Sequence, residues 1–178
     1  MAVRSGVETG NWPNWIELPA GKMTFVRFTE DYGRLLSSRR DAMAAASALK
    51  AMQAERDILT ANYAKEFPDD DQTLPWIDRA VAQAEAVVAL AKGESENGLK
   101  LLRAAADAEA ALPPPFGPPA LQKPSYELLG DELLALGLKS EAADAYRRAL
   151  AAAPQRRLSV AGLKAANTPS DSEAADRN

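Results

Sequence analysis

The chain has 178 residues, of which 37 are alanine, and it contains neither histidine nor cysteine. The lack of imidazole and thiol groups excludes Ser-His and Cys-His nucleophile pairs, zinc fingers and disulfides. A formal charge of −4 offers no basic face to nucleic acid or to an anionic membrane, so neither is an expected partner. No apolar run is long enough for a signal peptide or a membrane span, which makes the cytoplasm the default location.

The composition predicts an all-α fold. Alanine, leucine, glutamate and arginine dominate, while β-branched and aromatic residues are sparse. The length suits a single domain with one core, which we expect to span 23–166. Residues 1–22 hold several glycines and prolines and are expected to form an irregular N-terminal arm, which Trp12 and Trp15 pin to the helical body.

Two helical hairpins are expected in the first two thirds of the chain. Apolar residues at helical spacing predict the first over 23–66, where Asp41 is placed to cap the second helix. The second hairpin is expected over 72–112, with Pro75 in the first turn of its first helix and Gly93 ending that helix.

The segment 113–123 is rich in proline and cannot be helical, because proline lacks an amide donor and favours extended neighbours. We interpret it as a stiff crossover in which Phe116 is an anchor. The alternative is a polyproline ligand for an aromatic groove on another protein.

A third hairpin is expected over 124–154, with its turn at Gly137 and with Ser140 capping its second helix. The residues 155–166 read as a short capping helix. The polar segment 167–178 has nothing to bury and is expected to be a disordered tail.

The third hairpin also contains a recognisable residue pattern. Tyr126, Leu129, Gly130 and Leu133 follow the spacing W-x-x-L-G-x-x-Y, and an A-x-x-x-F spacing comes later in the hairpin. This pattern resembles the tetratricopeptide repeat, which implies a short α-solenoid of stacked antiparallel hairpins. Small motif residues let the paired helices approach, and large ones fill the space beside them. The motif positions are Tyr126, Leu129, Gly130, Leu133, Gly137, Ala142, Tyr146, Ala149 and Pro154.

The second hairpin repeats this pattern at a fixed distance. Five of its positions stand 44 residues before positions of the third hairpin, against a standard repeat period of about 34. The surplus of about ten residues matches the length of the proline-rich crossover, so the insertion falls between repeats. The first five positions are Ala86, Gly93, Gly98, Leu102 and Ala105, and their counterparts are Gly130, Gly137, Ala142, Tyr146 and Ala149.

A softer resemblance concerns the whole chain. The order of an ETGxW-like segment at 8–12, helical hairpins, a proline-rich crossover and a strong repeat is similar to the C-terminal part of larger bacterial repeat proteins of unassigned function. This similarity implies that the chain is a fragment or a short relative of such a protein.

The repeat resemblance implies binding of a protein or peptide in a concave groove lined by the first helix of each hairpin. Glu127 and Asp131 would repel a terminal carboxylate, so the carboxylate-binding subset of the family is not expected. The alternative is a groove filled by the arm or tail of the chain itself. The implied groove positions are Gln83, Val87, Leu90 and Ala91, then Glu127, Asp131, Leu134 and Ala135.

Other features have plainer interpretations. The run 69–71 is all aspartate but lacks the spacing of a calcium loop, and it is expected to be a solvated loop that caps the next helix. Trp12, Trp15 and Trp76 are expected to anchor segments and not to form a ligand cage. Arginine pairs lie beside acidic residues, which is typical of solvated helix faces. No metal and no cofactor is expected.

We therefore expect a non-catalytic interaction scaffold whose partner is a protein, a peptide or a second copy of the chain. No catalytic residue is nominated, since no carboxylate pair has a reason to be desolvated. Two alternatives remain open. The chain is a small helical enzyme or ligand-binding protein that uses carboxylates, or it supports a partner domain on its N-terminal side.

Overall fold

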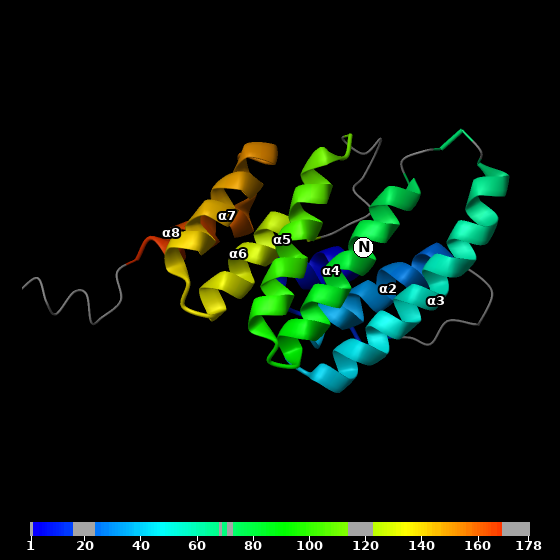
Figure 1. Cartoon of the computed structure of the whole chain (residues 1–178), viewed down its shortest axis with the longest axis horizontal. Coiled ribbons are helices and arrows are strands. Elements are labelled where there is room, and N and C mark those ends of the chain that lie inside the picture. Colours follow the sequence, from blue (N-terminus) through cyan, green and yellow to red (C-terminus); the bar gives the residue numbers. More distant parts are fainter. Residues whose placement is uncertain (1, 16–23, 68, 71–72, 114–122, 169–178) are drawn as a thin grey trace, which may run out of the picture. The chain divides into compact units, whose positions relative to one another are not determined.

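The architecture comes from a computed structural model, which describes residues 2–15, 24–67, 69–70, 73–113 and 123–168. These residues form eight α-helices and no strand, which confirms the all-helical prediction (Figure 1). The sequence predicted one domain over 23–166. By its internal contacts the chain divides into two compact units, Met1–Lys123 and Pro124–Asn178, at the end of the proline-rich segment. The predicted conformations of 114–122 and 169–178 lie outside the described residues.

Each unit is built from helices that pack on their neighbours in sequence. In the first unit α3 packs against both α2 and α4, and α4 packs against α5 (Figure 1). In the second unit α7 packs against both α6 and α8. The helices are α1 (Ala2–Thr9), α2 (Thr24–Ser37), α3 (Ala42–Glu66), α4 (Thr73–Ala91) and α5 (Ser95–Ala111) in the first unit, and α6 (Ser125–Ala135), α7 (Lys139–Ala152) and α8 (Arg157–Ala166) in the second.

The N-terminal arm differs from its prediction, because α1 is a regular helix. Two glycines make room for the indole rings that follow it. A Cβ atom on Gly6 would collide with Trp12, and one on Gly33 of α2 would lie 2.5 Å from the ring of Trp15. The Arg34 guanidinium also lies 5.7 Å from the Trp15 ring centre. The predicted anchoring to the helical body is confirmed for Trp15, whereas Trp12 contacts Gly6 and Trp15 within the N-terminal segment.

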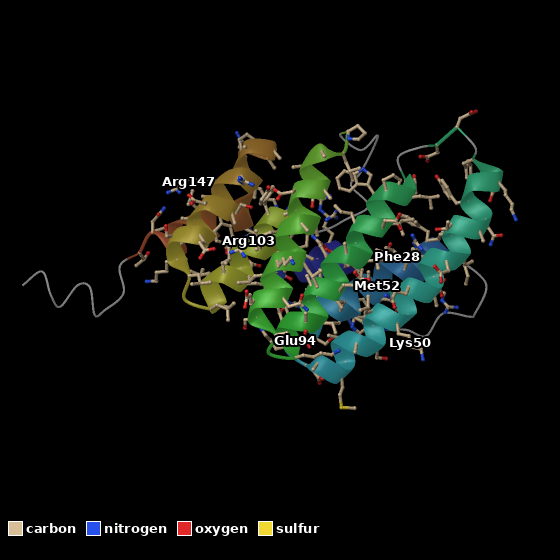
Figure 2. The ribbon with its side chains drawn as sticks, viewed as in Figure 1. Phe28, Lys50, Met52, Glu94, Arg103 and Arg147 are labelled. Carbon is tan, nitrogen blue, oxygen red and sulfur yellow. The ribbon has the colours of Figure 1, made fainter. Side chains whose placement is uncertain are left out.

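The first hairpin has a well-defined start and core. The Asp41 carboxylate accepts the backbone N–H groups of Met43 and Ala44 at 3.0 Å, so the predicted cap of α3 is confirmed. Phe28 of α2 and Met52 of α3 are both buried between the packed helices of this hairpin (Figure 2). Burying two side chains of this size contributes about 1.5–3 kcal/mol each.

The turns of the second and third hairpins have the same conformation. Gly93 and Gly137 adopt φ angles of 83° and 77°, which L side chains rarely adopt. Each glycine closes a Schellman motif, in which the residue after it donates back across the turn. Helices α5 and α7 begin two residues after their glycines, at positions 44 residues apart. The closing bonds are from Glu94 N–H to the Ala89 carbonyl, at 3.0 Å, and from Leu138 N–H to the Leu133 carbonyl, at 2.9 Å.

The same turn explains why the predicted cap at Ser140 is wrong. The Schellman turn sets the start of α7, so the N-cap position falls on Leu138 and has no side-chain cap bond. Ser140 lies inside the first helical turn.

Tyr146 forms the centre of the core of the second unit. Its ring fills space left by two glycines: a Cβ atom on Gly130 of α6 would lie 2.7 Å from it, and one on Gly162 of α8 would collide with it. Leu129, Leu133, Ala142 and Ala149 are buried, as the motif predicts. The prediction for Tyr126 is wrong, because this ring is only half-buried and its hydroxyl accepts a 2.6 Å hydrogen bond from Arg148.

Candidate functional site

The predicted groove positions on α4 are mostly internal. Gln83 is fully buried, accepts a 2.6 Å hydrogen bond from the Tyr32 hydroxyl and donates a 3.0 Å hydrogen bond to the Lys123 carbonyl. Its amide joins α2 and α4 to the last residue of the first unit, so it does not face a ligand. Val87 is buried as well. The groove prediction is therefore wrong for these two residues.

On α6 the prediction for Glu127 is wrong for a different reason. Both carboxylate oxygens of Glu127 accept from the guanidinium of Arg156, at 2.6 and 2.8 Å, and Ser159 donates to one of them at 2.5 Å. Glu127 and Ser159 are completely buried. This cluster fixes the start of α8 against α6, because a buried carboxylate needs its cation and donors nearby.

The remaining predicted positions are half-buried, except Ala135, which is exposed. Asp131 accepts a 2.7 Å hydrogen bond from the Tyr146 hydroxyl, so it is also part of the internal framework. Leu90 lies against Gly98, where a Cβ atom would be 2.6 Å from the leucine side chain. Leu134 is half-buried, and its assignment to a groove stays a prediction.

A buried arginine connects the helices of the second hairpin. The Arg79 guanidinium on α4 donates to Glu109 on α5 at 2.8 Å and lies 5.4 Å from the Trp76 ring centre. Burial lowers the pKa of Arg79, and the Glu109 carboxylate opposes that shift. Trp76 therefore contacts an arginine of its own helix, whereas Trp12 and Trp15 pack against each other with ring centres 6.1 Å apart.

The aspartate run connects α3 to α4, as far as the structure describes it. The Asp70 carboxylate accepts the backbone N–H and the hydroxyl of Thr73, at 2.9 and 2.8 Å, and also the Tyr63 hydroxyl at 2.7 Å. Asp70 thus caps the start of α4, as the sequence predicts. Among the described residues no group of three or more acidic side chains is placed to hold a metal ion.

An open apolar groove lies between the start of α2 and the C-terminal half of α3. Its volume is about 320 Å³. Three of its apolar side chains are exposed: Phe25 by 42%, Val26 by 39% and Ile58 by 40%. The groove is lined by Thr24, Phe25, Val26, Ile58, Leu59, Asn62, Tyr63 and Glu66. We call this surface the α2–α3 groove.

The far end of the α2–α3 groove is bordered by aromatic rings. Tyr63 is half-buried, and its ring centre lies 4.7 Å from that of Phe67, which is 47% exposed. The hydrogen bond to Asp70 holds the Tyr63 side chain in place. Leu59 is nearly buried at the base. The groove thus combines a buried base with an exposed apolar edge.

The groove residues are not among the predicted site residues. The sequence does contain a signal, because α3 has 25 residues and α2 only 14. At 1.5 Å per residue α3 is longer than α2 by about 16 Å, so α2 cannot cover one side of α3 along its whole length. Apolar residues that continue along the longer helix, such as Ile58 and Tyr63, mark the part of α3 that α2 does not cover.

No helix within the described ranges is both long enough and apolar enough to cross a membrane. Comparison of the chain with protein-family models, with curated proteins and with solved structures gives no match.

Proposed function

We propose that the chain is a non-catalytic helical module of tetratricopeptide type that binds a segment of another protein in the α2–α3 groove. The observation that carries this proposal is the set of exposed apolar side chains gathered around one groove. Apolar side chains that are exposed singly are normal on a protein surface, whereas a contiguous patch usually marks a contact site.

The internal repeat supports the tetratricopeptide part of the proposal. Two hairpins share the start of their second helix, their glycine turn and their buried small residues at a constant spacing of 44 residues. Within each unit a helix packs on the next one, and the first helix of a hairpin also touches the helix after that hairpin. Such packing is typical of stacked helical hairpins.

A small apolar ligand is the second candidate occupant of the α2–α3 groove. Its volume of about 320 Å³ is at the lower end of the range of roughly 300–1,000 Å³ for small-molecule sites. The groove is open along one side and has an exposed edge, which favours the side chains of a partner protein over an enclosed molecule.

The proposal is tested by capture of partners from the lysate of the native host with four forms of the chain. These are the wild type, Phe25→Ala, Ile58→Ala and the control Met43→Ala. Met43 is on the same helix as Ile58 and is 85% exposed, so its loss removes an apolar side chain away from the groove. A partner of the groove should be retained by the wild type and by Met43→Ala.

Titration of that partner in purified form then gives the affinities. We expect Phe25→Ala and Ile58→Ala each to weaken binding about tenfold, since an apolar anchor contributes on the order of 1–2 kcal/mol. Far-UV circular dichroism checks that each variant remains helical. Equal affinity of all four forms would show that the partner binds elsewhere.

A further inference from the structure

The lining of the α2–α3 groove contains one formal charge. Glu66 is the only ionised side chain among the eight lining residues, and the others are apolar, aromatic or neutral polar. Glu66 is exposed, and among the described residues it has no ion-pair partner. As far as the structure describes the chain, the groove is therefore apolar, and its lining contains one carboxylate without an ion-pair partner.

Two nearby cations among the described residues do not neutralise this carboxylate. Arg27 of α2 forms a 2.6 Å ion pair with Glu55 of α3. Lys65 is next to Glu66 in sequence but does not line the groove, because consecutive helical residues point about 100° apart. Neither of these two cations therefore supplies the counter-charge.

The partial charges of the helix ends at this site also do not neutralise Glu66. The amino end of α2 and the carboxyl end of α3 both lie at the groove, since Thr24 and Glu66 line it. These ends carry opposite partial charges of about half a unit, which largely cancel. Among the lining residues the formal charge is therefore that of Glu66.

A neutral polar residue lies one helical turn before this carboxylate. Asn62 and Glu66 are four residues apart, and side chains at that spacing share one face of a helix. Asn62 is exposed and makes no hydrogen bond with its side chain among the described residues. The pair presents an acceptor-rich edge beside the apolar base, which suits an ammonium or guanidinium group.

From this lining we infer that the α2–α3 groove binds a protein segment with apolar anchors followed by a lysine or arginine, whose cation pairs with Glu66. The inference rests on the proposed function and names the chemistry of the partner. From Ile58 to Glu66 is eight residues, or about 12 Å along α3. That span matches two turns of a bound helix, or about four residues of an extended segment.

The test uses the full chain and a panel of short capped peptides, measured by isothermal titration calorimetry. Each peptide has leucine anchors and one variable residue, which is lysine, glutamine or glutamate. The variable residue follows the anchors by two helical turns in one series and by four extended residues in the other. We expect the lysine peptide to bind about two- to fivefold more tightly than the glutamine peptide, as for a partly exposed ion pair. The glutamate peptide should bind least well.

Variants of the chain test the pairing with Glu66 separately from the binding of apolar anchors in the groove. Glu66→Gln should remove the preference for lysine, and Glu66→Lys should reverse it in favour of glutamate. The control Glu96→Gln changes the net charge equally but lies in the first turn of α5, outside the groove. Ile58→Ala should weaken all three peptides by a similar factor.

Different failures have different meanings. Peptide binding that is sensitive to Ile58→Ala but indifferent to charge would overturn the inference and leave the proposed function intact. Binding that ignores Ile58→Ala would overturn the proposed function itself. If no peptide bound up to millimolar concentration, the inference would also be overturned. Self-association of the chain that Ile58→Ala abolishes would overturn it as well, because a second copy of the chain would then occupy the groove.

Discussion

Several single residues in this chain connect neighbouring helices. Glu55 does so with a charged carboxylate, whose burial between helices is unfavourable. Its carboxylate is buried between α2 and α3 and pairs with Arg27 at 2.6 Å. Burial raises the pKa of Glu55 above its ordinary value of 4.5, the Arg27 cation opposes this shift, and the nearby Asp31 carboxylate adds to it. The folded chain therefore binds this proton more tightly than the unfolded chain does.

This shift predicts the sign of a pH effect. The stability contributed by protonated Glu55 is fully present below pH 4.5 and is lost as the pH rises through the higher folded-state pKa. Glu55→Gln cannot titrate, so it lacks this pH-dependent contribution. Relative to the wild type, its free energy of unfolding should be highest at pH 7 and should decrease as the pH is lowered towards 4.5. Urea unfolding at several pH values measures the difference.

The exposed Glu96→Gln variant serves as the control for that experiment. Its difference in unfolding free energy from the wild type should change little between pH 7 and 4.5, because Glu96 lies on the surface of α5. Parallel pH profiles for wild type and Glu55→Gln would show that the pKa of Glu55 does not change on folding.

At the scale of elements, the hairpin turn is the feature that repeats most closely. Gly93 and Gly137 share a positive φ angle and the same pattern of closing bonds, although one lies in each compact unit. Alanine in this left-handed conformation is strained by roughly 1–2 kcal/mol per residue. A Cβ atom on either glycine meets no other atom within 4 Å, so steric contact adds nothing.

We therefore expect Gly93→Ala and Gly137→Ala each to lower the free energy of unfolding of their own hairpin by about 1 kcal/mol. Native-state amide exchange of α4 and α5, and of α6 and α7, measures each hairpin separately. Gly10→Ala is a matched control, because Gly10 has the same sign of φ but follows α1. Clearly different losses at Gly93 and Gly137 would mean that the two turns are not equivalent.

Elements were predictable from the sequence where a local rule determines them. The cap at Asp41 and the stops at Gly93 and Gly137 follow from backbone chemistry, and all three are confirmed. The glycines of the N-terminal segment were interpreted as helix-breaking residues, yet Gly6 lies inside α1. There its missing side chain leaves room for the Trp12 ring. That packing depends on residues brought together only by folding.

The site was less predictable than the fold, for the same physical reason. A family analogy placed Gln83 and Glu127 in a groove, but polar residues on a helix face do not reveal whether a neighbouring helix already binds them. The open groove depends on which part of α3 remains uncovered. Helix lengths hinted at this difference, while residue types alone did not.

At the scale of the whole molecule, the stability of the second unit depends strongly on its Glu127 cluster. Arg156→Ala would leave the buried carboxylate without its cation, which typically costs about 3–5 kcal/mol. That loss is a large part of the 5–15 kcal/mol that usually stabilises a domain. Amide exchange should accelerate by at least two orders of magnitude in α6, α7 and α8, and change little in α2 to α5.

Arg157→Ala provides the comparison, because Arg157 is the next residue and is exposed. It should leave the exchange rates of α6, α7 and α8 within a few-fold of those of the wild type. If Arg156→Ala accelerated exchange equally throughout the described helices, the two units would unfold as one cooperative block.

The division into two units also determines the intrinsic fluorescence of each part of the chain. All three tryptophans, Trp12, Trp15 and Trp76, belong to Met1–Lys123, whereas Pro124–Asn178 contains only the tyrosines Tyr126 and Tyr146 as aromatic chromophores. Indole emission excited at long wavelength therefore follows the first unit alone. Helicity measured by circular dichroism follows both, so a mismatch between the two signals during unfolding would identify which unit melts first.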